Sequence, residues 1–509
     1  MVIGPLFCLE PTNDEAKELV RDHRMRNPFD NLVCNGFGVE SIGIGHTPSK
    51  ADGYILAVLG RSGRRSDVQI PRKISRKYIS RVHCTFEIDH KTGVIYICDG
   101  NGESRSSGGR SPTLRLGGSN SHGFLNGRAV LLPDLNTELF IGAEGFGELR
   151  FKLIWDEDRA KVLEYGSRLS KIIEPPSRSV FSFASASRST SYDSSAMKTN
   201  LAWAEIKELA TGSSTRLVKA VDVHSGRMMA VKILQDPFRN NYKVPSLTKE
   251  VKILQKAKHP CIVELISSRG WGNGPIEIFY QHFEENFADV IYALDQEQGG
   301  KLILQDICRA VLHDILEALV YIHGFGIIHN QIEPRNIYLS IDGDRCRFYL
   351  GNFGLSTMEK DSEHVVDATM LYMAPECFEK KPKTVAVDIW ALYVTVIHAM
   401  DEIFRANTRH ERDYAKICEA IQGVVNGGDK LFGDSKATGL RLSHLKLMAH
   451  PNAGQRATAA HMLQEVIELD RDSIHGQRIH DSTSITDPDP PAKRKTLLQR
   501  LVGYATKRE

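Results

Sequence analysis

The sequence has no Cys-x-x-Cys pair, because its nine cysteines are scattered singly along 509 residues. This absence argues against a zinc site and against a secreted disulfide framework, and it favours a reducing compartment. The chain also lacks any run of about 18 apolar residues of the kind that crosses a membrane. The short apolar patch at the N-terminus has no basic residue before it, unlike a signal peptide. We therefore expect a soluble intracellular protein without a membrane partner.

The chain has 65 Lys and Arg residues and 63 Asp and Glu residues, so neither sign of charge dominates. Such a balance produces no global field that would attract nucleic acid. The Gly- and Ser-rich residues 100–119 contain three arginines but no interleaved aromatic residue. A solvated loop is the preferred interpretation of this stretch. We expect no direct contact with nucleic acid.

Composition divides the chain into five regions, and its length allows two or three domains. Residues 1–50 are an N-terminal extension with little periodicity, and residues 51–156 are rich in short strand-like runs. Residues 157–200 begin with a possible short helix and continue as a serine-rich flexible linker. Residues 201–470 contain longer apolar patterns, and residues 471–509 form a polar, basic tail.

Two loops of the region 51–156 carry groups that suit a phosphate. Arg61 follows the apolar run YILAVLG, and Ser80 and Arg81 precede the run CTFEI. A phosphate dianion on a loop surface needs a fixed guanidinium, a hydroxyl donor and backbone N–H groups. Charge-assisted hydrogen bonds of this kind contribute roughly 1.5 to 3 kcal/mol each.

The order of Gly-Arg, Ser-Arg-x-His and a later Asn-Gly resembles a forkhead-associated domain, an all-β sandwich that binds phosphothreonine peptides. The resemblance assigns the guanidinium to Arg61, the hydroxyl to Ser80 and a second cation to Arg81. His83 is implied to brace the loop structurally. The family's peptide-binding asparagine is replaced by Ser121, and Asn120 lies beside it; both are retained as candidate contacts.

Residues 328–354, IHNQIEPRNIYLSIDGDRCRFYLGNFG, resemble the catalytic centre of a protein kinase. That family has His-Arg-Asp-x-x-x-x-Asn followed by Asp-Phe-Gly, and His329 and Asn336 stand at matching positions. Gln331 replaces the catalytic carboxylate, and Asn352 replaces the metal-binding one. A positioned general base contributes roughly 10²- to 10⁴-fold, and a second carboxylate holds magnesium. The two replacements predict a pseudokinase.

The residues upstream resemble the small lobe of a kinase. Ala-Val-Lys ends in Lys232, which the resemblance assigns to the nucleotide phosphates, and Glu250 on an amphipathic helix is its natural ion-pair partner. The glycine-rich phosphate loop is reduced to ATGSST, where only Gly212 remains. Because glycines let backbone N–H groups approach phosphates, ATP and magnesium are expected to bind weakly. Asn336 and Asn352 complete the candidate nucleotide set, and no other metal ligand is assigned.

Further kinase elements follow in the expected order. An apolar pattern over DICRAVLHDILEALVYIH predicts a helix that ends at Gly324. Ala-Pro-Glu ends in Glu376, and Arg456 stands where kinases keep the arginine that pairs with that glutamate. Asn330 occupies the place of the arginine that pairs with a phosphorylated activation segment. We therefore expect no switch by phosphorylation there.

Together these resemblances imply a multidomain protein, with an all-β sandwich followed by a bilobal α+β kinase-like fold. This combination is similar to fungal DNA-damage and meiotic checkpoint kinases, which implies a phosphorylated protein partner and a nuclear or cytoplasmic location. The basic residues Lys493, Arg494 and Lys495 agree with nuclear import. Three hypotheses stay open: a phosphothreonine-binding scaffold, a weakly active serine/threonine kinase, and a kinase fold that binds nucleotide without phosphate transfer. The oligomeric state is left open.

Overall fold

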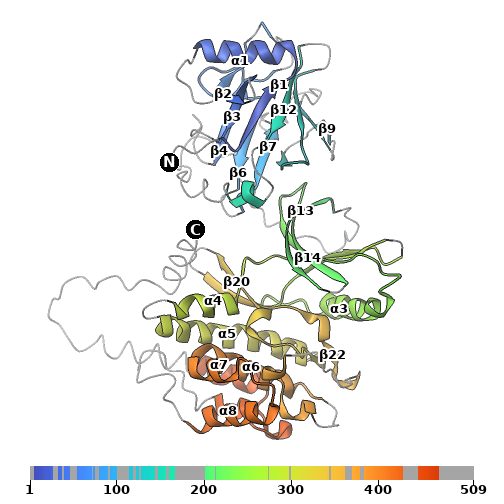
Figure 1. Ribbon diagram of the computed structural model, residues 1–509, viewed down its shortest axis with the longest axis vertical. Helices are drawn as coiled ribbons and strands as arrows, with labels where there is room; N and C mark the ends of the chain where they lie inside the picture. The colour runs from blue at the N-terminus through green and yellow to red at the C-terminus, as the bar shows by residue number, and fades with distance from the viewer. Residues whose placement is uncertain are drawn as a thin grey trace, which may run out of the picture. The chain divides into compact units, whose positions relative to one another are not determined.

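A computed structural model describes residues 5–166 and 201–468, with gaps at 27–32, 37–38, 46–53, 72, 75–78, 90–91, 100–113, 119–121, 125–127, 144–146, 156–159, 165, 213, 273, 297–299, 343–344, 362–368, 379–382 and 428–444. The chain forms two compact units, Met1–Val231 and Lys232–Glu509, whose elements are labelled in Figure 1. The boundary falls inside strand β15 (Met228–Leu234). Within the described residues, every helix is too short or too polar to cross a membrane.

Seven strands of the first unit form an antiparallel sheet of order β2-β3-β1-β12-β11-β8-β9. They are β1 (Phe7–Pro11), β2 (Val33–Gly36), β3 (Val39–Ile44), β8 (Leu114–Gly117), β9 (His122–Phe124), β11 (Glu138–Ile141) and β12 (Leu149–Ile154). Residues of β1 alternate between buried and half-buried. This period of two places one face of the sheet in the core.

A second sheet of order β10-β7-β6-β4-β5 covers that face. Its strands are β4 (Ile55–Gly60), β5 (Val68–Gln69), β6 (Cys84–Ile88), β7 (Ile95–Asp99) and β10 (Arg128–Leu131). The two sheets share one apolar core, in which the rings of Phe7 and Phe86 meet edge to face with centroids 5.5 Å apart. The three strand-like runs of the sequence are β4, β6 and β7, so their prediction is confirmed.

The described residues between 5 and 45 are part of this two-sheet domain, whereas the sequence predicted residues 1–50 as an N-terminal extension. β1 pairs with β12 from Cys8 opposite Ile154 onward, and helix α1 (Asp14–Arg26) buries Leu19 and Val20 in the same core. The sequence pattern is weak here because α1 is dominated by charged residues and also buries Asp22 and His23. Pairing across more than 100 residues leaves no local signal.

Strands β13 (Trp203–Thr211) and β14 (Thr215–Asp222) close the first unit. A small apolar core joins them to the outer side of β7 and β10, through Val94, Val130, Val221 and neighbouring residues. The predicted short helix after residue 157 is present at residues 160–164. The rest of the predicted linker, 167–200, and the tail from residue 469 lie outside the described residues.

The turn from β14 to β15 contains His224, Ser225 and Gly226. Gly226 has a φ of +72°, and its N–H donates to the Asp222 carbonyl at 2.8 Å. A Cβ atom at this glycine would meet the Tyr96 hydroxyl oxygen at 1.9 Å. Glycine is therefore required here by both backbone conformation and space.

In the second unit, β15 continues a five-stranded sheet of order β13-β14-β15-β17-β16, with β16 at Leu265–Arg269 and β17 at Ile276–Gln281. Helix α3 (Val244–Lys256) follows the short 3-10 helix η2 (Asn241–Lys243) and has proline in its first turn, where proline fits. Its apolar face buries Leu247, Val251 and Leu254.

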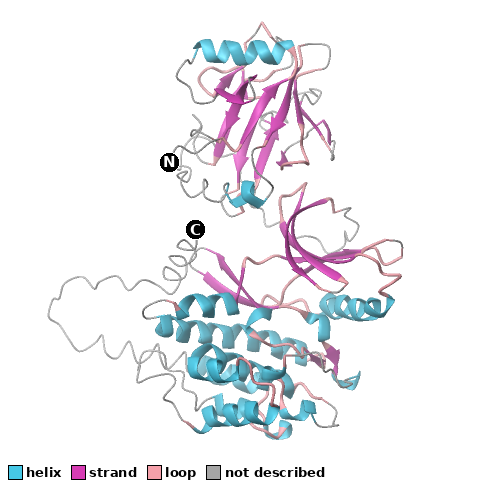
Figure 2. Cartoon of the chain, viewed as in Figure 1, coloured by secondary structure: helices cyan, strands magenta, loops and turns pink. Residues whose placement is uncertain are grey.

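The remainder of the second unit is mainly helical (Figure 2). Its helices are α4 (Phe287–Asp295), α5 (Gly300–His323), α6 (Ala386–Met400), α7 (Glu402–Thr408) and α8 (Tyr414–Asn426), and its short strands are β18 (Glu285–Asn286), β19 (Ile327–Ile328), β20 (Ile337–Asp342), β21 (Arg345–Leu350) and β22 (Thr357–Met358). Short 3-10 helices, among them η3 (Pro334–Asn336), η4 (Phe353–Leu355) and η7 (Pro375–Phe378), lie between them. The predicted helix is α5, which ends at His323 immediately before Gly324. Its apolar stripe from Ile307 to Ile322 is fully buried, as predicted.

Candidate functional site

Lys232 on β15 and Glu250 on α3 form the ion pair that the sequence predicts. The distance from Lys232 Nζ to Glu250 Oε2 is 2.8 Å, and the glutamate side chain is only 3% exposed. Tyr280, on β17, donates its hydroxyl to the other oxygen, Oε1, at 2.7 Å. Burial and then the adjacent carboxylate hold the pKa of Tyr280 well above its usual range, so the hydroxyl keeps its proton. Sequence reasoning missed this third member, because Tyr280 reads only as one of several apolar strand residues.

His329 anchors the segment between β19 and η3. Its ring is fully buried, and burial lowers its pKa to about 4 against the opposing effect of Asp388. The Gln331 N–H donates to Nδ1 at 3.3 Å, and Nε2 lies 3.0 Å from the Gly351 carbonyl oxygen. The neutral ring therefore carries its proton on Nε2 and donates to that carbonyl. Phe353 packs edge-on against the same ring.

Asn330 has a structural role that sequence reasoning did not find. Its φ is +66°, a left-handed conformation that asparagine tolerates better than most residues. Its N–H donates to Asp388 Oδ1 at 2.9 Å. Its side-chain Nδ2 donates to the Leu355 carbonyl at 3.0 Å and to Thr357 Oγ1 at 3.1 Å. The residue that lacks the expected cation thus joins two segments by neutral hydrogen bonds.

The side chain of Asn336 connects the Asn352 side chain to the backbone of Gln331. Asn336 Nδ2 donates to the Gln331 backbone carbonyl at 2.9 Å, and Asn352 Nδ2 donates to Asn336 Oδ1 at 3.1 Å. Asn336 is buried, whereas Asn352 is exposed and has a φ of +61°. Glu333 contributes a carboxylate to this cluster, with Oε1 3.4 Å from Asn336 Nδ2. The side chains of Gln331, Asn336 and Asn352 are neutral at every ordinary pH.

The ion pair and the amides meet at Gly354. A Cβ atom added there would lie 3.5 Å from Asn352 Oδ1, 3.6 Å from Glu250 Oε2 and 3.7 Å from Lys232 Nζ. The structure therefore brings together four of the five residues predicted for a nucleotide, Lys232, Glu250, Asn336 and Asn352, with Gln331 beside them.

Gly212, the fifth predicted residue, belongs to the first unit and lies in the turn between β13 and β14. Its N–H donates to the Thr215 carbonyl at 2.8 Å, and the residue is exposed. Ser213 lies outside the described residues. The turn is tight, as a turn that contains glycine allows.

Glu376 and Arg456 form a buried pair, as predicted. The guanidinium nitrogens lie 2.6 and 3.0 Å from the two carboxylate oxygens. Arg456 also donates to the Ala386 carbonyl at 2.8 Å and lies over the Trp390 ring at 5.2 Å. Through the bidentate contact and the bond to Ala386, Arg456 connects η7 to the start of α6.

In the two-sheet domain of the first unit, the loop that contains Arg61 is adjacent to the loop that contains Ser80 and Arg81. The Arg61 N–H donates to the Ser80 carbonyl and the Ser62 N–H to the Arg81 carbonyl, both at 3.0 Å. A Cβ atom at Gly60 would meet the Arg81 carbonyl oxygen at 2.3 Å, so glycine permits this close approach. Arg61, Ser80 and Arg81 are thus brought to one place, as a shared site requires.

His83 braces this loop, as predicted. Its ring is fully buried, and its Nδ1 accepts the Ser80 N–H at 3.2 Å. The other two predicted contacts, Asn120 and Ser121, fall between β8 and β9 and lie outside the described residues.

Comparison with known proteins defines the second half of the chain. The protein kinase domain family matches residues 203–467, more than half of the sequence. The chain belongs to the protein kinase family, so the predicted kinase-like fold is confirmed for this region.

Curated relatives are serine/threonine kinases of low identity. Serine/threonine-protein kinase 10 of Xenopus tropicalis is 29% identical over 60% of this chain and 33% of its own length. Mitogen-activated protein kinase 15 of Xenopus laevis is 32% identical over 36% of this chain and 32% of its own. Calcium/calmodulin-dependent protein kinase type II of Caenorhabditis elegans is 29% identical over 38% of this chain and 26% of its own. The chain thus spans about a third of the length of these relatives.

Proposed function

We propose that this protein is a phosphothreonine-binding scaffold whose kinase domain transfers little or no phosphate. The observation that carries the proposal is the hydrogen-bonded pair of amide side chains Asn336 and Asn352, anchored to the backbone of Gln331, beside an intact Lys232–Glu250 pair. A kinase framework is present, but the two positions that need carboxylates hold neutral side chains. Typical members of this family use ATP and magnesium.

The loss of the base is chemical rather than geometric. A carboxylate at position 331 would accept the proton of the substrate hydroxyl, whereas the carboxamide of Gln331 has no basic lone pair at ordinary pH. The Glu333 carboxylate contacts Asn336 through Nδ2, whereas Asn352 contacts Asn336 through Oδ1.

Magnesium does not fit the residues present. The ion prefers carboxylate oxygens and nearly octahedral geometry, whereas Asn352 offers one neutral amide oxygen. The corresponding oxygen of Asn336 already accepts a hydrogen bond from Asn352 Nδ2. The amides at positions 336 and 352 therefore supply no carboxylate ligand for the ion.

The first domain supplies the proposed recognition function. Its two sheets place the exposed Arg81 and the half-buried Arg61 and Ser80 on adjoining loops. Two cations and a hydroxyl suit a phosphate dianion. The resemblance to forkhead-associated domains suggests that this phosphate is the one carried by a phosphothreonine side chain. The proposed partner is a phosphorylated protein.

Transfer of labelled γ-phosphate tests the kinase half of the proposal. The full-length chain should label neither itself nor a mixed substrate. A Gln331→Asp/Asn352→Asp variant should gain transfer, because the Lys232–Glu250 pair is already in place. Lys232→Met in the restored variant is the matched control and should abolish the gain.

Transfer by the parent chain that disappears in Lys232→Met would instead support a weakly active serine/threonine kinase with a substitute base. Labelling that survives Lys232→Met would indicate a contaminating kinase, and an immunopurified sample would then decide.

Binding to a phosphothreonine peptide pool tests the first domain. Arg61→Ala should weaken binding roughly 10- to 100-fold, the range expected for one lost charge-assisted hydrogen bond. Arg64→Ala removes an exposed arginine of the same loop and should have little effect. Equal retention of phosphorylated and unphosphorylated pools would overturn the assignment.

We further propose a nuclear site of action, on the basis of the basic run Lys493, Arg494 and Lys495. A fluorescent fusion with all three changed to alanine should lose nuclear accumulation. Unchanged distribution would contradict this part of the proposal.

A further inference from the structure

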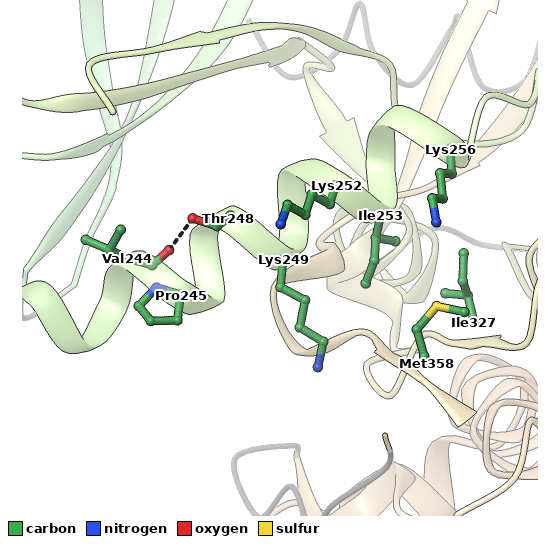
Figure 3. Close-up of a pocket in the computed structure, with 9 residues that line it drawn as sticks. All are labelled: Val244, Pro245, Thr248, Lys249, Lys252, Ile253, Lys256, Ile327 and Met358. Atoms are coloured by element: carbon green, nitrogen blue, oxygen red, sulfur yellow. Dashed lines mark hydrogen bonds between the residues drawn. The ribbon is translucent and has the colours of Figure 1, made fainter. Parts of the chain in front are cut away.

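A groove lies between α3 and the β19–β22 pair. Figure 3 shows the residues that line it. They come from three elements and comprise Val244, Pro245, Thr248, Lys249, Lys252, Ile253 and Lys256 of α3, Ile327 of β19 and Met358 of β22. The cavity volume is about 580 Å³, within the range of roughly 300–1,000 Å³ typical of ligand clefts.

The floor of the groove is apolar. Ile253 is 5% exposed and Ile327 is fully buried, and Met358 is half-buried beside them. Ile327 and Met358 are opposite each other in the β19–β22 pair, so backbone pairing fixes their relative position. The flexible thioether of Met358 can adapt its shape to an inserted side chain.

The rim of the groove is basic. Lys249, Lys252 and Lys256 are exposed and are spaced three and four residues apart, which places them on one face of the helix. No described acidic side chain forms an ion pair with any of them. Like charges at these spacings destabilise a helix slightly. The three lysines therefore lower the stability of α3 unless an anionic ligand offsets their repulsion.

The length of the row limits the ligand. Lys256 follows Lys249 by seven positions, which corresponds to about 10 Å along the helix axis. An extended peptide covers that distance with about three residues. An apolar floor between cations suits an anchor side chain flanked by carboxylates, whereas a nucleic acid backbone would leave the floor unused.

We propose that this groove binds a short acidic segment of a partner protein, with an apolar anchor residue on Ile253, Ile327 and Met358 and with flanking carboxylates at the three lysines. The site is independent of the proposed phosphothreonine site and of phosphate transfer. Its position on the helix that carries Glu250 lets a bound partner steady the Lys232–Glu250 pair.

Fluorescence anisotropy with the full-length chain tests the proposal. The probe is a labelled peptide in which glutamates flank a central pair of leucines. A Lys249→Glu/Lys252→Glu/Lys256→Glu variant should weaken binding at least roughly tenfold, as expected for several exposed ion pairs. The same variant should bind a lysine-flanked version of the peptide, which reverses the charge pattern. Lys258→Glu changes an exposed lysine outside the groove and is the matched control.

A second peptide, with both leucines changed to serine, separates the floor from the rim. Weaker binding of this peptide by the parent supports the apolar anchor. Equal binding of the leucine and serine peptides would overturn the proposal in favour of a general anion surface. Displacement of the probe by a single-stranded oligonucleotide, with the same dependence on the three lysines, would have the same consequence. No binding of the probe by the parent, or equal binding by parent and triple variant, would also overturn it.

Discussion

The two sides of the kinase centre differ in charge although they adjoin at Gly354. One side has the ion pair Lys232–Glu250, with both oxygens of the carboxylate engaged. On the other side the amide side chains of Asn336 and Asn352 hydrogen-bond to each other, and Asn336 also contacts the Gln331 backbone and Glu333. The comparison shows that an ion pair and a pair of hydrogen-bonded amides adjoin within one kinase domain. Ionic contacts remain where they hold elements together, and neutral contacts occupy the positions that carry the chemistry in other kinases.

The largest expected effect concerns the buried pair Glu376–Arg456, the most enclosed ionic contact of the framework. Arg456→Met should destabilise the chain by about 3–5 kcal/mol, because a buried carboxylate is left without its partner. Chemical denaturation measures this change. Arg409→Met, at an exposed arginine, should change stability by less than about 0.5 kcal/mol. A small effect of Arg456→Met would show that water reaches the pair.

The next effect is the pH dependence that comes from His329. Its pKa is about 4 in the folded chain and about 6.5 when unfolded, so the unfolded state binds more protons between these values. Stability therefore rises with pH across this window, and about 3 kcal/mol present above pH 6.5 is lost as the pH falls to 4.

The slope of unfolding free energy against pH isolates this residue. His329→Gln should flatten the slope between pH 4 and 6.5, although the variant starts from a lower stability. Some slope should remain, because burial also lowers the pKa of His398. Identical slopes in parent and variant would contradict a neutral, Nε2-protonated His329.

A smaller effect is expected at Asn330. Asn330→Ala loses two side-chain hydrogen bonds and places alanine at a positive φ, which should cost about 2 kcal/mol. Asn330→Gly loses the same hydrogen bonds but relieves the backbone, so it should cost about 1 kcal/mol. Thermal or chemical denaturation compares the two variants. Equal costs would mean that the left-handed backbone contributes nothing.

The smallest effect tests the amide side directly. Asn352→Asp should let magnesium-ATP stabilise the chain by about 1 kcal/mol more than it stabilises the parent, at a ligand concentration near ten times the dissociation constant. The measurement is the melting temperature with and without ligand, and Asn352→Ala is the control. Equal stabilisation of the parent and Asn352→Asp by magnesium-ATP would show that the missing carboxylate at position 352 does not limit nucleotide binding.

Much of the kinase centre could be predicted because its residues lie at short, fixed spacings. His329, Asn336 and the Gln331 and Asn352 replacements are legible from 27 consecutive letters, residues 328–354. The partners Lys232–Glu250 and Glu376–Arg456 were predictable because each residue sits in its own local motif. Tyr280 was not predictable, because a tyrosine in a β-rich run has the same pattern whether its hydroxyl meets solvent or Glu250.

The first domain shows the opposite balance. Arg61, Ser80 and His83 follow from a local pattern, whereas the sheet partnership of β1 with β12 spans most of the domain. Charged residues dominate α1, so its narrow apolar face gives too weak a sequence pattern to predict that the helix packs on the core.

The sequence by itself determined which charges are present and which are missing, since side-chain chemistry at a motif position needs no coordinates. It therefore sufficed to identify a kinase family member with amides at positions 331 and 352. Only the tertiary structure decided that Asn330 bridges Leu355 and Thr357, that Tyr280 completes the ion pair, and that three lysines of α3 line an apolar groove. These relations depend on residues far apart in the chain, and packing alone brings such residues together.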